Sequence, residues 1–148
     1  MKQGQSTGWL DIWSGLGAAL APRRCVEALR DRWVWAALAL GLAGLPFSPG
    51  PMPPFWRLVL TAMTEETVYR ALLQEQLEQM LPGRRGPLTT GALIASAIFA
   101  LSHLPTHTPL MACLTFFPSL IFGVLWTRHR SLWLCAAMHC WYNVAFFL

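Results

Sequence analysis

The chain has 148 residues, a length typical of a single domain. Hydrophobic residues make up 55% of it and charged residues only 12%, whereas a soluble domain usually has about 25% charged residues. The net charge of +4 comes from ten arginines and one lysine, most of which cluster beside apolar runs instead of forming a stripe with interleaved aromatic residues. This composition indicates a protein that uses the lipid bilayer as its solvent, and it argues against a nucleic-acid partner.

The predicted elements fall into two regions. Residues 1–30 are expected to form an N-terminal interfacial or cytoplasmic region, with a loosely packed helix over residues 9–21. Residues 31–148 are expected to form an all-α, polytopic bundle of transmembrane helices. Its five hydrophobic segments are, in chain order, Trp33–Phe47, Phe55–Leu81, Thr89–His103, Pro109–Thr127 and Ser131–Leu148.

Three of these segments have features that affect how they cross a membrane. The first is shorter than the ~20 residues that span a bilayer, so residues from about Leu29 are expected to extend it. The second changes from apolar to amphipathic midway, so its later half is expected to leave the hydrocarbon. In the fourth, Pro118 predicts a kink.

The positions of the arginines predict an orientation. If the five segments alternate in direction, the arginine clusters before Trp33, in residues 82–87 and in residues 128–130 all fall on one side of the membrane. Eight of the eleven Lys and Arg residues belong to these clusters. The positive-inside rule makes that side cytoplasmic.

Two adjacent glutamates lie inside the second hydrophobic segment, where ionisable groups are costly and usually functional. They begin about 15 Å along the helix axis from Phe55, at 1.5 Å per residue. Arg70 follows Glu66 by four residues, so the two can form an ion pair on one helix face. Glu65 points about 100° away from Glu66, toward the face of Tyr69. The alternative is that both glutamates are helix-end charges where the segment emerges into water.

Two histidines and an asparagine are the other polar groups placed in or beside the apolar segments. His103 ends the third segment and, taken alone, is explained equally well as an interfacial histidine. His139 and Asn143 are four residues apart on one helix face, and a structural hydrogen bond between helices would explain them too. His107 and His129 lie in predicted loops and are expected to be ordinary surface histidines.

Together these groups have complementary chemistry. A carboxylate and an imidazole can hold and deprotonate a water molecule as general base. A second histidine with an asparagine can donate hydrogen bonds to the oxyanion of a tetrahedral intermediate. The set is sufficient for hydrolysis of an amide bond without a covalent nucleophile. The sequence contains no GxSxG, no HExxH and no pair of intramembrane aspartates.

Three short motifs carry a resemblance to a known family. "EETVYR" matches EExxxR, "FALSH" matches FxxxH and "HCWYN" matches HxxxN, in this order along residues 55–148. The chain resembles the CPBP family, which comprises CAAX proteases and bacteriocin-processing (Abi) enzymes and acts as glutamic-type intramembrane endopeptidases. The resemblance implies a catalytic core at about residues 55–148 and an integral, multi-pass protein, with the small size favouring a prokaryotic cell membrane.

The resemblance also implies a role for each matching residue. Glu65 resembles the catalytic base, which works with His103 on the attacking water. His139 and Asn143 resemble the pair that stabilises the oxyanion. The supporting positions of the motifs are Glu66, Arg70 and Phe99. The implied substrate is a small membrane-associated or secreted peptide or protein, cleaved at a CAAX-type end or a C-terminal sorting tail, and no cofactor is expected.

Other readings of the same residues remain open. Glu65, His103 and His139 have ligand types that suit zinc or another divalent metal, which would make the protein a metalloprotease. A non-enzymatic immunity or scaffold protein of the membrane is a further alternative. A haem held axially by His103 and His139 would leave Glu65, Glu66 and Arg70 unexplained.

Overall fold

The computed structural model describes residues 9–45 and 50–148, most of which are helical. Two helices precede the bundle, α1 (Trp9–Ala19) and α2 (Pro22–Ala28). The predicted helix over residues 9–21 is therefore present as α1. Both helices are tied to the rest of the chain, because Trp133 Nε1 donates to the Leu20 carbonyl (2.8 Å) and Arg24 Nη1 to the Arg130 carbonyl (3.0 Å). The division of the chain at residue 30 stays a prediction.

The remaining helices follow the predicted segments closely. They are α3 (Arg32–Gly41) with the short 3₁₀ helix η1 (Leu42–Gly44), α4 (Phe55–Glu66), the π-helix η2 (Thr67–Gln74), α5 (Glu75–Met80), α6 (Thr90–Ser102), α7 (Pro109–Leu114), α8 (Phe116–His129) and α9 (Leu132–Phe147). The end of the first predicted segment, Pro46–Phe47, lies outside the described residues. The loop between α5 and α6 forms a small hairpin in which β1 (Arg84–Arg85) pairs with β2 (Leu88–Thr89). Gly86 supplies the positive φ of 61° that its turn needs.

Side-chain caps explain where several helices begin. The Thr89 hydroxyl accepts from the Ala92 N–H (3.0 Å) at the start of α6, and the Ser131 hydroxyl accepts from the Leu134 N–H (3.3 Å) at the start of α9. Such a cap satisfies one of the backbone donors that a helix leaves unpaired at its N-terminus. The predicted segment boundaries at Thr89 and Ser131 are thus the N-caps of these two helices.

The fourth segment is interrupted, though not at the predicted residue. Its two helices, α7 and α8, meet at Thr115, three residues before Pro118. Proline has no N–H and its ring collides with the preceding turn, so the distortion appears in the turn before the proline. The Thr115 hydroxyl donates to the Ala112 carbonyl (2.7 Å) and satisfies an acceptor at this junction.

Among the described residues, one helical run is long and apolar enough to cross a membrane. It is Pro109–His129, with 21 residues and a mean hydropathy of 1.9 in its most apolar window. The apolar runs Arg32–Gly44, Thr90–Ser102 and Leu132–Phe147 are shorter. The prediction of five membrane spans therefore stays a prediction.

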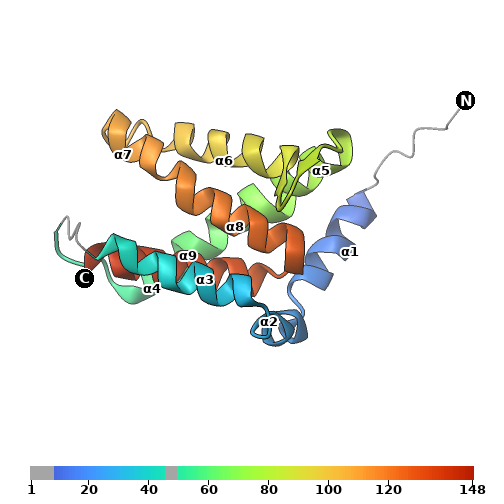
Figure 1. Ribbon diagram of the computed structural model, residues 1–148, viewed down its shortest axis with the longest axis horizontal. Coiled ribbons are helices and arrows are strands. Elements are labelled where there is room, and N and C mark those ends of the chain that lie inside the picture. Colours follow the sequence, from blue (N-terminus) through green and yellow to red (C-terminus); the bar gives the residue numbers. More distant parts are fainter. Residues whose placement is uncertain (1–8, 46–49) are drawn as a thin grey trace, which may run out of the picture.

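The helices pack in two groups around α8 (Figure 1). On one side α6 packs along α8, with α7 joined to both, and on the other side α9 packs against α8, α4 and α3. The π-helix η2 contacts α6, α8 and α9, so it connects the two groups at their centre. This arrangement places α4, α6 and α9, which carry the three motifs, in contact with η2.

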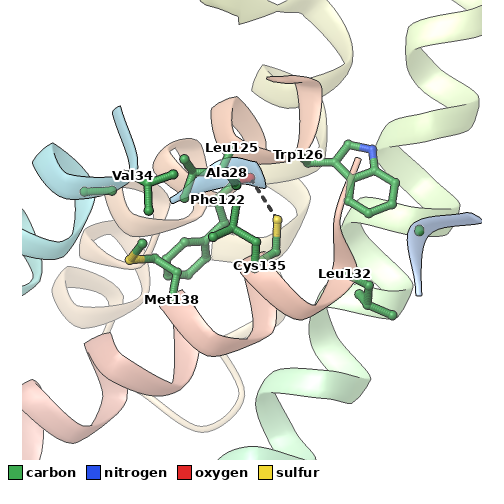
Figure 2. Close-up of a cluster of buried hydrophobic side chains, with 11 residues drawn as sticks. Ala28, Val34, Phe122, Leu125, Trp126, Leu132, Cys135 and Met138 are labelled. Atoms are coloured by element: carbon green, nitrogen blue, oxygen red, sulfur yellow. Dashed lines mark hydrogen bonds between the residues drawn. The ribbon is translucent and has the colours of Figure 1, made fainter. Parts of the chain in front are cut away.

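A buried apolar cluster joins α8 and α9 to the N-terminal helices (Figure 2). Phe122, Leu125 and Cys135 lie at its centre and are each at most 1% exposed. Burying a side chain of the size of Leu or Phe stabilises a fold by about 1.5–3 kcal/mol. The cluster therefore fixes α8 against α9, two helices that carry residues of the candidate site.

Helix α3 is held on α9 by hydrogen bonds from aromatic side chains. Trp141 Nε1 donates to the Leu38 carbonyl (3.0 Å), and the Tyr142 hydroxyl donates to the Ala37 carbonyl (2.8 Å). Gly41 makes this close approach possible, because a Cβ there would lie 2.4 Å from Trp141 Nε1.

The C-terminal end of α8 carries a cluster of charged contacts. Asp31 caps α3 by accepting from the Trp33 N–H (3.0 Å), and its other oxygen accepts from Arg128 Nε (2.7 Å) and contacts His129 Nε2 (3.0 Å). The hydrogen bond from Arg128 holds the pKa of Asp31 below its usual value of 3.8. The prediction that His129 is an ordinary surface histidine is wrong, since it is the last residue of α8 and its side chain is partly buried against Asp31.

Candidate active site

Glu65 and Glu66 lie at the point where α4 changes into the π-helix η2. The Glu66 side chain is fully buried, whereas 27% of the Glu65 side chain is exposed. π-Helical turns are rare, and those found inside α-helices frequently lie at functional sites. The two adjacent carboxylates thus have different surroundings, as the sequence predicts.

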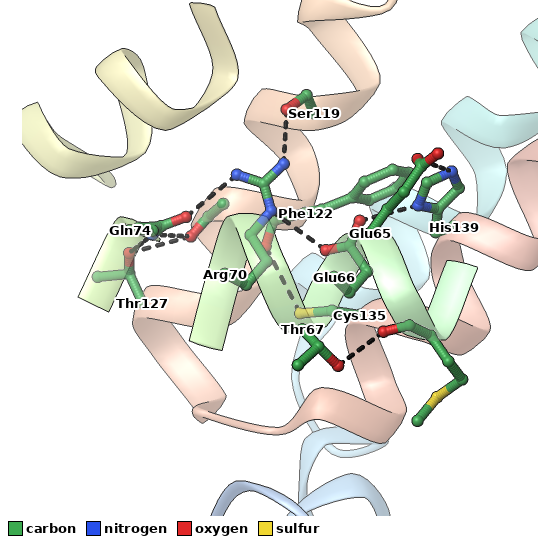
Figure 3. Close-up of polar contacts among 12 residues, drawn as sticks. Glu65, Glu66, Thr67, Arg70, Gln74, Ser119, Phe122, Thr127, Cys135 and His139 are labelled. Carbon is green, nitrogen blue, oxygen red and sulfur yellow. Dashed lines mark hydrogen bonds and ion pairs between the residues drawn. The ribbon is translucent and has the colours of Figure 1, made fainter. Parts of the chain in front are cut away.

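Glu66 forms the predicted ion pair with Arg70. Arg70 Nε donates to Glu66 Oε2 (3.1 Å), and both side chains are fully buried (Figure 3). The other guanidinium nitrogens are also bonded, Nη2 to Ser119 Oγ (2.5 Å) and Nη1 to Gln74 Oε1 (3.2 Å). A buried charge is tolerated when it is paired and its remaining donors find acceptors, and Arg70 meets both conditions.

The second oxygen of Glu66 contacts His139 on α9, which the sequence analysis did not foresee. His139 Nδ1 lies 2.8 Å from Glu66 Oε1. An ionised carboxylate can only accept, so Nδ1 carries the proton and donates it to this bond. The role assigned to Glu66 from the sequence, support of its own helix, is incomplete because Glu66 also holds the ring of His139.

The other nitrogen of His139 faces Glu65. Nε2 lies 3.7 Å from Glu65 Oε2, so one imidazole stands between the two adjacent carboxylates. Figure 3 shows both carboxylates directed toward the ring from α4. The contact that the structure shows for Glu65 is with His139, and the pairing of Glu65 with His103 expected from the sequence stays a prediction.

Aromatic rings enclose His139 on two sides. Phe122 of α8 stacks almost parallel on it, with ring centroids 5.0 Å apart and an interplanar angle of 21°. Phe99 of α6 meets it nearly edge-on, with centroids 6.0 Å apart. His139 is 5% exposed, so its ring is held by packing as well as by the bond to Glu66.

His103 is the C-cap residue of α6, and its ring packs on Phe99 with centroids 4.5 Å apart. Its Nδ1 lies 2.8 Å from the Phe99 carbonyl oxygen, which can only accept, so Nδ1 carries the proton. In the neutral ring Nε2 is then the basic nitrogen. Phe99 therefore packs against both histidines, consistent with its predicted packing role, and a haem between the two rings would have to displace it.

The α6 end near His103 is also tied to η2. The Tyr69 hydroxyl donates to Ser102 Oγ (2.8 Å), and Ser102 Oγ donates to the Phe99 carbonyl (2.7 Å). The Tyr69 ring meets Phe99 edge-on, with centroids 4.9 Å apart. Tyr69 follows Glu65 by four residues, so this contact sets the distance between the helix of Glu65 and the helix of His103.

Asn143 lies on α9 one turn beyond His139 and is partly buried. Within the described part of the chain, its side-chain amide makes no hydrogen bond, so its N–H₂ group is available to another molecule. Convergence of Glu65, His103, His139 and Asn143 on one water-sized space stays a prediction.

The alternative metal site was expected to use Glu65, His103 and His139. In residues 9–45 and 50–148, no three or more His, Cys, Asp or Glu side chains are placed to bind one ion. The residues present do not fit a metal in this arrangement, and no step proposed below passes through one.

The comparison with family models decides the relationship. The model described as type II CAAX prenyl endopeptidase, Rce1-like, matches residues 48–145, well over half of the chain. The chain belongs to this family. The match confirms the resemblance drawn from the three motifs, and it covers α4, α6 and α9, which carry them. No curated protein and no solved structure matches the chain significantly.

Membership in the Rce1-like family makes the chain an integral membrane protease. The family match extends over all the site residues described above, including those on α8. The match names the class of enzyme but not its mechanism.

Several residues that build the site were missed in the sequence. Gln74 and Glu78 extend the predicted pair of Glu66 and Arg70 at the same spacing of four, and Gln74 Nε2 donates to Glu78 Oε1 (2.8 Å) and to the Gly123 carbonyl (3.0 Å). In an ideal α-helix such a row drifts by about 40° per step, and the wider π turn of η2 reduces this drift. Polar residues at every fourth position of an apolar helix were the signal. Nothing in the sequence of α8 pointed to Ser119 or Phe122.

Proposed function

We propose that the chain is a glutamic-type intramembrane endopeptidase in which a water molecule activated by Glu65 attacks the peptide carbonyl. The observation that carries the proposal is that His139 contacts two carboxylates that differ in burial. Glu66 is fully buried and bonded to His139 Nδ1, whereas Glu65 is partly exposed and lies beside Nε2. Both oxygens of Glu66 are already bonded, one to Arg70 and the other to His139, so Glu65 is the carboxylate that substrate and water can reach.

The proposed reaction begins with general-base catalysis. Glu65 takes one proton from the water as its oxygen bonds to the peptide carbonyl carbon, and the carbonyl oxygen becomes the oxyanion of a tetrahedral intermediate. His103, whose Nε2 is the basic nitrogen in the neutral ring, is proposed to orient the same water. Glu65 then returns the proton to the leaving nitrogen while the C–N bond breaks. The products are one new carboxyl end and one new amino end, so atoms and charge balance.

His139 and Asn143 are proposed to stabilise the oxyanion. In the resting site His139 is the Nδ1–H tautomer bonded to the Glu66 carboxylate, and it becomes a donor at Nε2 while that nitrogen shares the proton that Glu65, 3.7 Å away, takes from the water. Asn143 adds an amide N–H₂ from the next turn of α9. Donors held in place in a site of low dielectric stabilise a developing oxyanion strongly because they need no reorganisation during the reaction.

The proposed substrate is a peptide or protein whose membrane-embedded or C-terminal segment places the scissile bond at the depth of Glu65. Two substrate forms fit, a CAAX-type end and a C-terminal sorting tail. The purified chain in liposomes should release the C-terminal fragment from a prenylated CAAX peptide or from a peptide with an apolar tail, detected by mass spectrometry. Release from neither peptide, with correctly folded protein, would contradict the proposed activity and favour an immunity or scaffold role.

Replacing Asn143 with alanine should lower kcat by about 10²–10³-fold, the usual effect of losing one oxyanion donor. The melting temperature should change little, because the described residues offer the Asn143 amide no hydrogen bond to lose. Asn143→Asp is the matched control, since it keeps the shape but replaces the donor by an acceptor. Activity of the aspartate variant close to that of the wild type would remove Asn143 from the oxyanion site.

A further inference from the structure

Helix α8 lies outside the three motifs, yet it contacts the site at two neighbouring positions. Ser119 Oγ accepts from Arg70 Nη2 at 2.5 Å, and the Phe122 ring stacks on His139. The two residues are three apart, so they lie on the same face of α8. Both are at most 1% exposed.

These contacts close a ring of side chains. Starting from α8, Ser119 holds Arg70, Arg70 holds Glu66, Glu66 holds His139, and His139 stacks on Phe122, which returns to α8. Figure 3 shows these five side chains meeting between α8, η2 and α9. We propose that Ser119 and Phe122 are positioning residues that hold the imidazole of His139 in the orientation and tautomer that the reaction needs.

Ser119 acts on His139 through two intermediates. A fully buried guanidinium needs an acceptor for each of its nitrogens, and the Ser119 hydroxyl supplies the one for Nη2. Without this hydroxyl, Nη2 lacks an acceptor, so the guanidinium is expected to rotate toward another one. This rotation weakens the hydrogen bond from Arg70 Nε to Glu66. Glu66 is then free to rotate, and His139 loses the acceptor that fixes its tautomer.

Phe122 acts on His139 directly. An interplanar angle of 21° leaves little room for the imidazole to rotate about its Cβ–Cγ bond. The Phe122 backbone is itself tied to α9, because Cys135 Sγ donates to its carbonyl (3.6 Å). The aromatic face is therefore fixed relative to the helix that carries His139.

Gly123 keeps the space beside this ring open. A Cβ at this position would lie 3.1 Å from Gln74 Oε1 and 3.4 Å from Arg70 Nη1. The sequence "SLIFG", residues 119–123, thus supplies an acceptor, an aromatic face and a gap on one face of α8. Together with the EExxxR and HxxxN motifs it completes the surroundings of Glu66.

The inference rests on the proposed function, and its test has a readout that does not need activity. Ser119→Ala, Ser119→Thr and Phe122→Met are compared with Ser96→Ala, which removes a buried hydroxyl from α6 that has no hydrogen-bond partner among the described residues. Cleavage gives kcat and KM, and ¹⁵N NMR of histidine-labelled protein in lipid nanodiscs gives the tautomer of His139. Thermal melts confirm that each variant is folded.

We expect Ser119→Ala and Phe122→Met to lower kcat by about 10–10²-fold with KM unchanged, and Ser119→Thr to retain activity. In the wild type and in Ser96→Ala, His139 should give one species with the proton on Nδ1. In Ser119→Ala and Phe122→Met it should give a mixture of tautomers.

Two results would overturn the positioning role. One is a single Nδ1–H species of His139 in all variants, whatever their kcat. The other is unchanged kcat in Ser119→Ala and Phe122→Met. Failure of the proposed function gives a different pattern, in which the wild type cleaves no peptide while the tautomers still differ between variants.

Discussion

Replacing Glu65 with glutamine should lower kcat by about 10²–10⁴-fold, the range for loss of a general base. Glutamine keeps the shape of the side chain and removes its basicity. Glu65 is partly exposed, and its contact with His139 Nε2 is long, at 3.7 Å, so the substitution removes no fully buried ion pair. The bundle should therefore stay folded, which circular dichroism and a thermal melt would verify alongside the cleavage rate.

Glu66→Gln is the matched comparison for this experiment. Glu66 is fully buried and bonded to both Arg70 and His139, so its neutralisation should reduce stability as well as activity. A folded Glu65→Gln protein with the activity of the wild type would rule out Glu65 as the base. If Glu66→Gln lost activity and Glu65→Gln did not, Glu66 would be the general base and Glu65 the supporting residue.

Replacing Arg70 with alanine should reduce the free energy of unfolding by about 3–5 kcal/mol, because it leaves the buried charge of Glu66 without its partner. The guanidinium is fully buried and also bonded to Gln74 and Ser119, so the substitution opens a cavity beside three polar groups. Unfolding in detergent, followed by far-UV circular dichroism against denaturant, measures the change.

A double variant separates the charge from the packing. Glu66→Gln with Arg70→Met removes both charges while keeping most of the volume, and replacing a buried ion pair in this way is often neutral or stabilising. It should regain much of the stability lost in Arg70→Ala and remain impaired in cleavage, because His139 has lost its carboxylate. An Arg70→Ala protein as stable and active as the wild type would contradict the buried pair.

The sequence predicted those features that depend on one helix at a time. The i,i+4 pairing of Glu66 with Arg70 follows from helix geometry, and it is present in the structure. The starts of α6 and α9 agree with the predicted segment boundaries at Thr89 and Ser131, which the structure shows to be N-caps. Each of these depends only on the spacing of residues within a single segment.

Features that depend on packing between helices could not be predicted in this way. The bond between Glu66 and His139 joins residues 73 positions apart, and no pattern within either helix states which neighbour it faces. The stacking of Phe122 on His139 has the same origin. Phenylalanine in an apolar segment is ordinarily explained as core or lipid contact, so its place beside a polar ring becomes visible only when the helices are assembled.

The change from α-helix to π-helix after Glu66 also could not be predicted from the sequence. The segment following it reads as an ordinary amphipathic helix, and the π turn depends on how η2 fits between α6, α8 and α9. The interruption of the fourth segment was predicted from Pro118, but its position at Thr115 depends on which backbone groups the neighbouring turn can satisfy. A single proline therefore predicts that a helix is distorted, but it does not predict at which residue.

The central claim, that Glu65 activates the water with His103 and without a metal, is tested most directly by the cleavage rate of protein stripped of metal. The purified chain is exhaustively chelated, its metal content is measured by mass spectrometry, and its kcat is determined in metal-free liposomes before and after addition of stoichiometric zinc. We expect the same kcat before and after the addition of zinc, with far less than one metal ion per protein molecule after chelation. Abolition of cleavage by chelation, with recovery on adding one equivalent of zinc, would contradict it and establish the metalloprotease alternative.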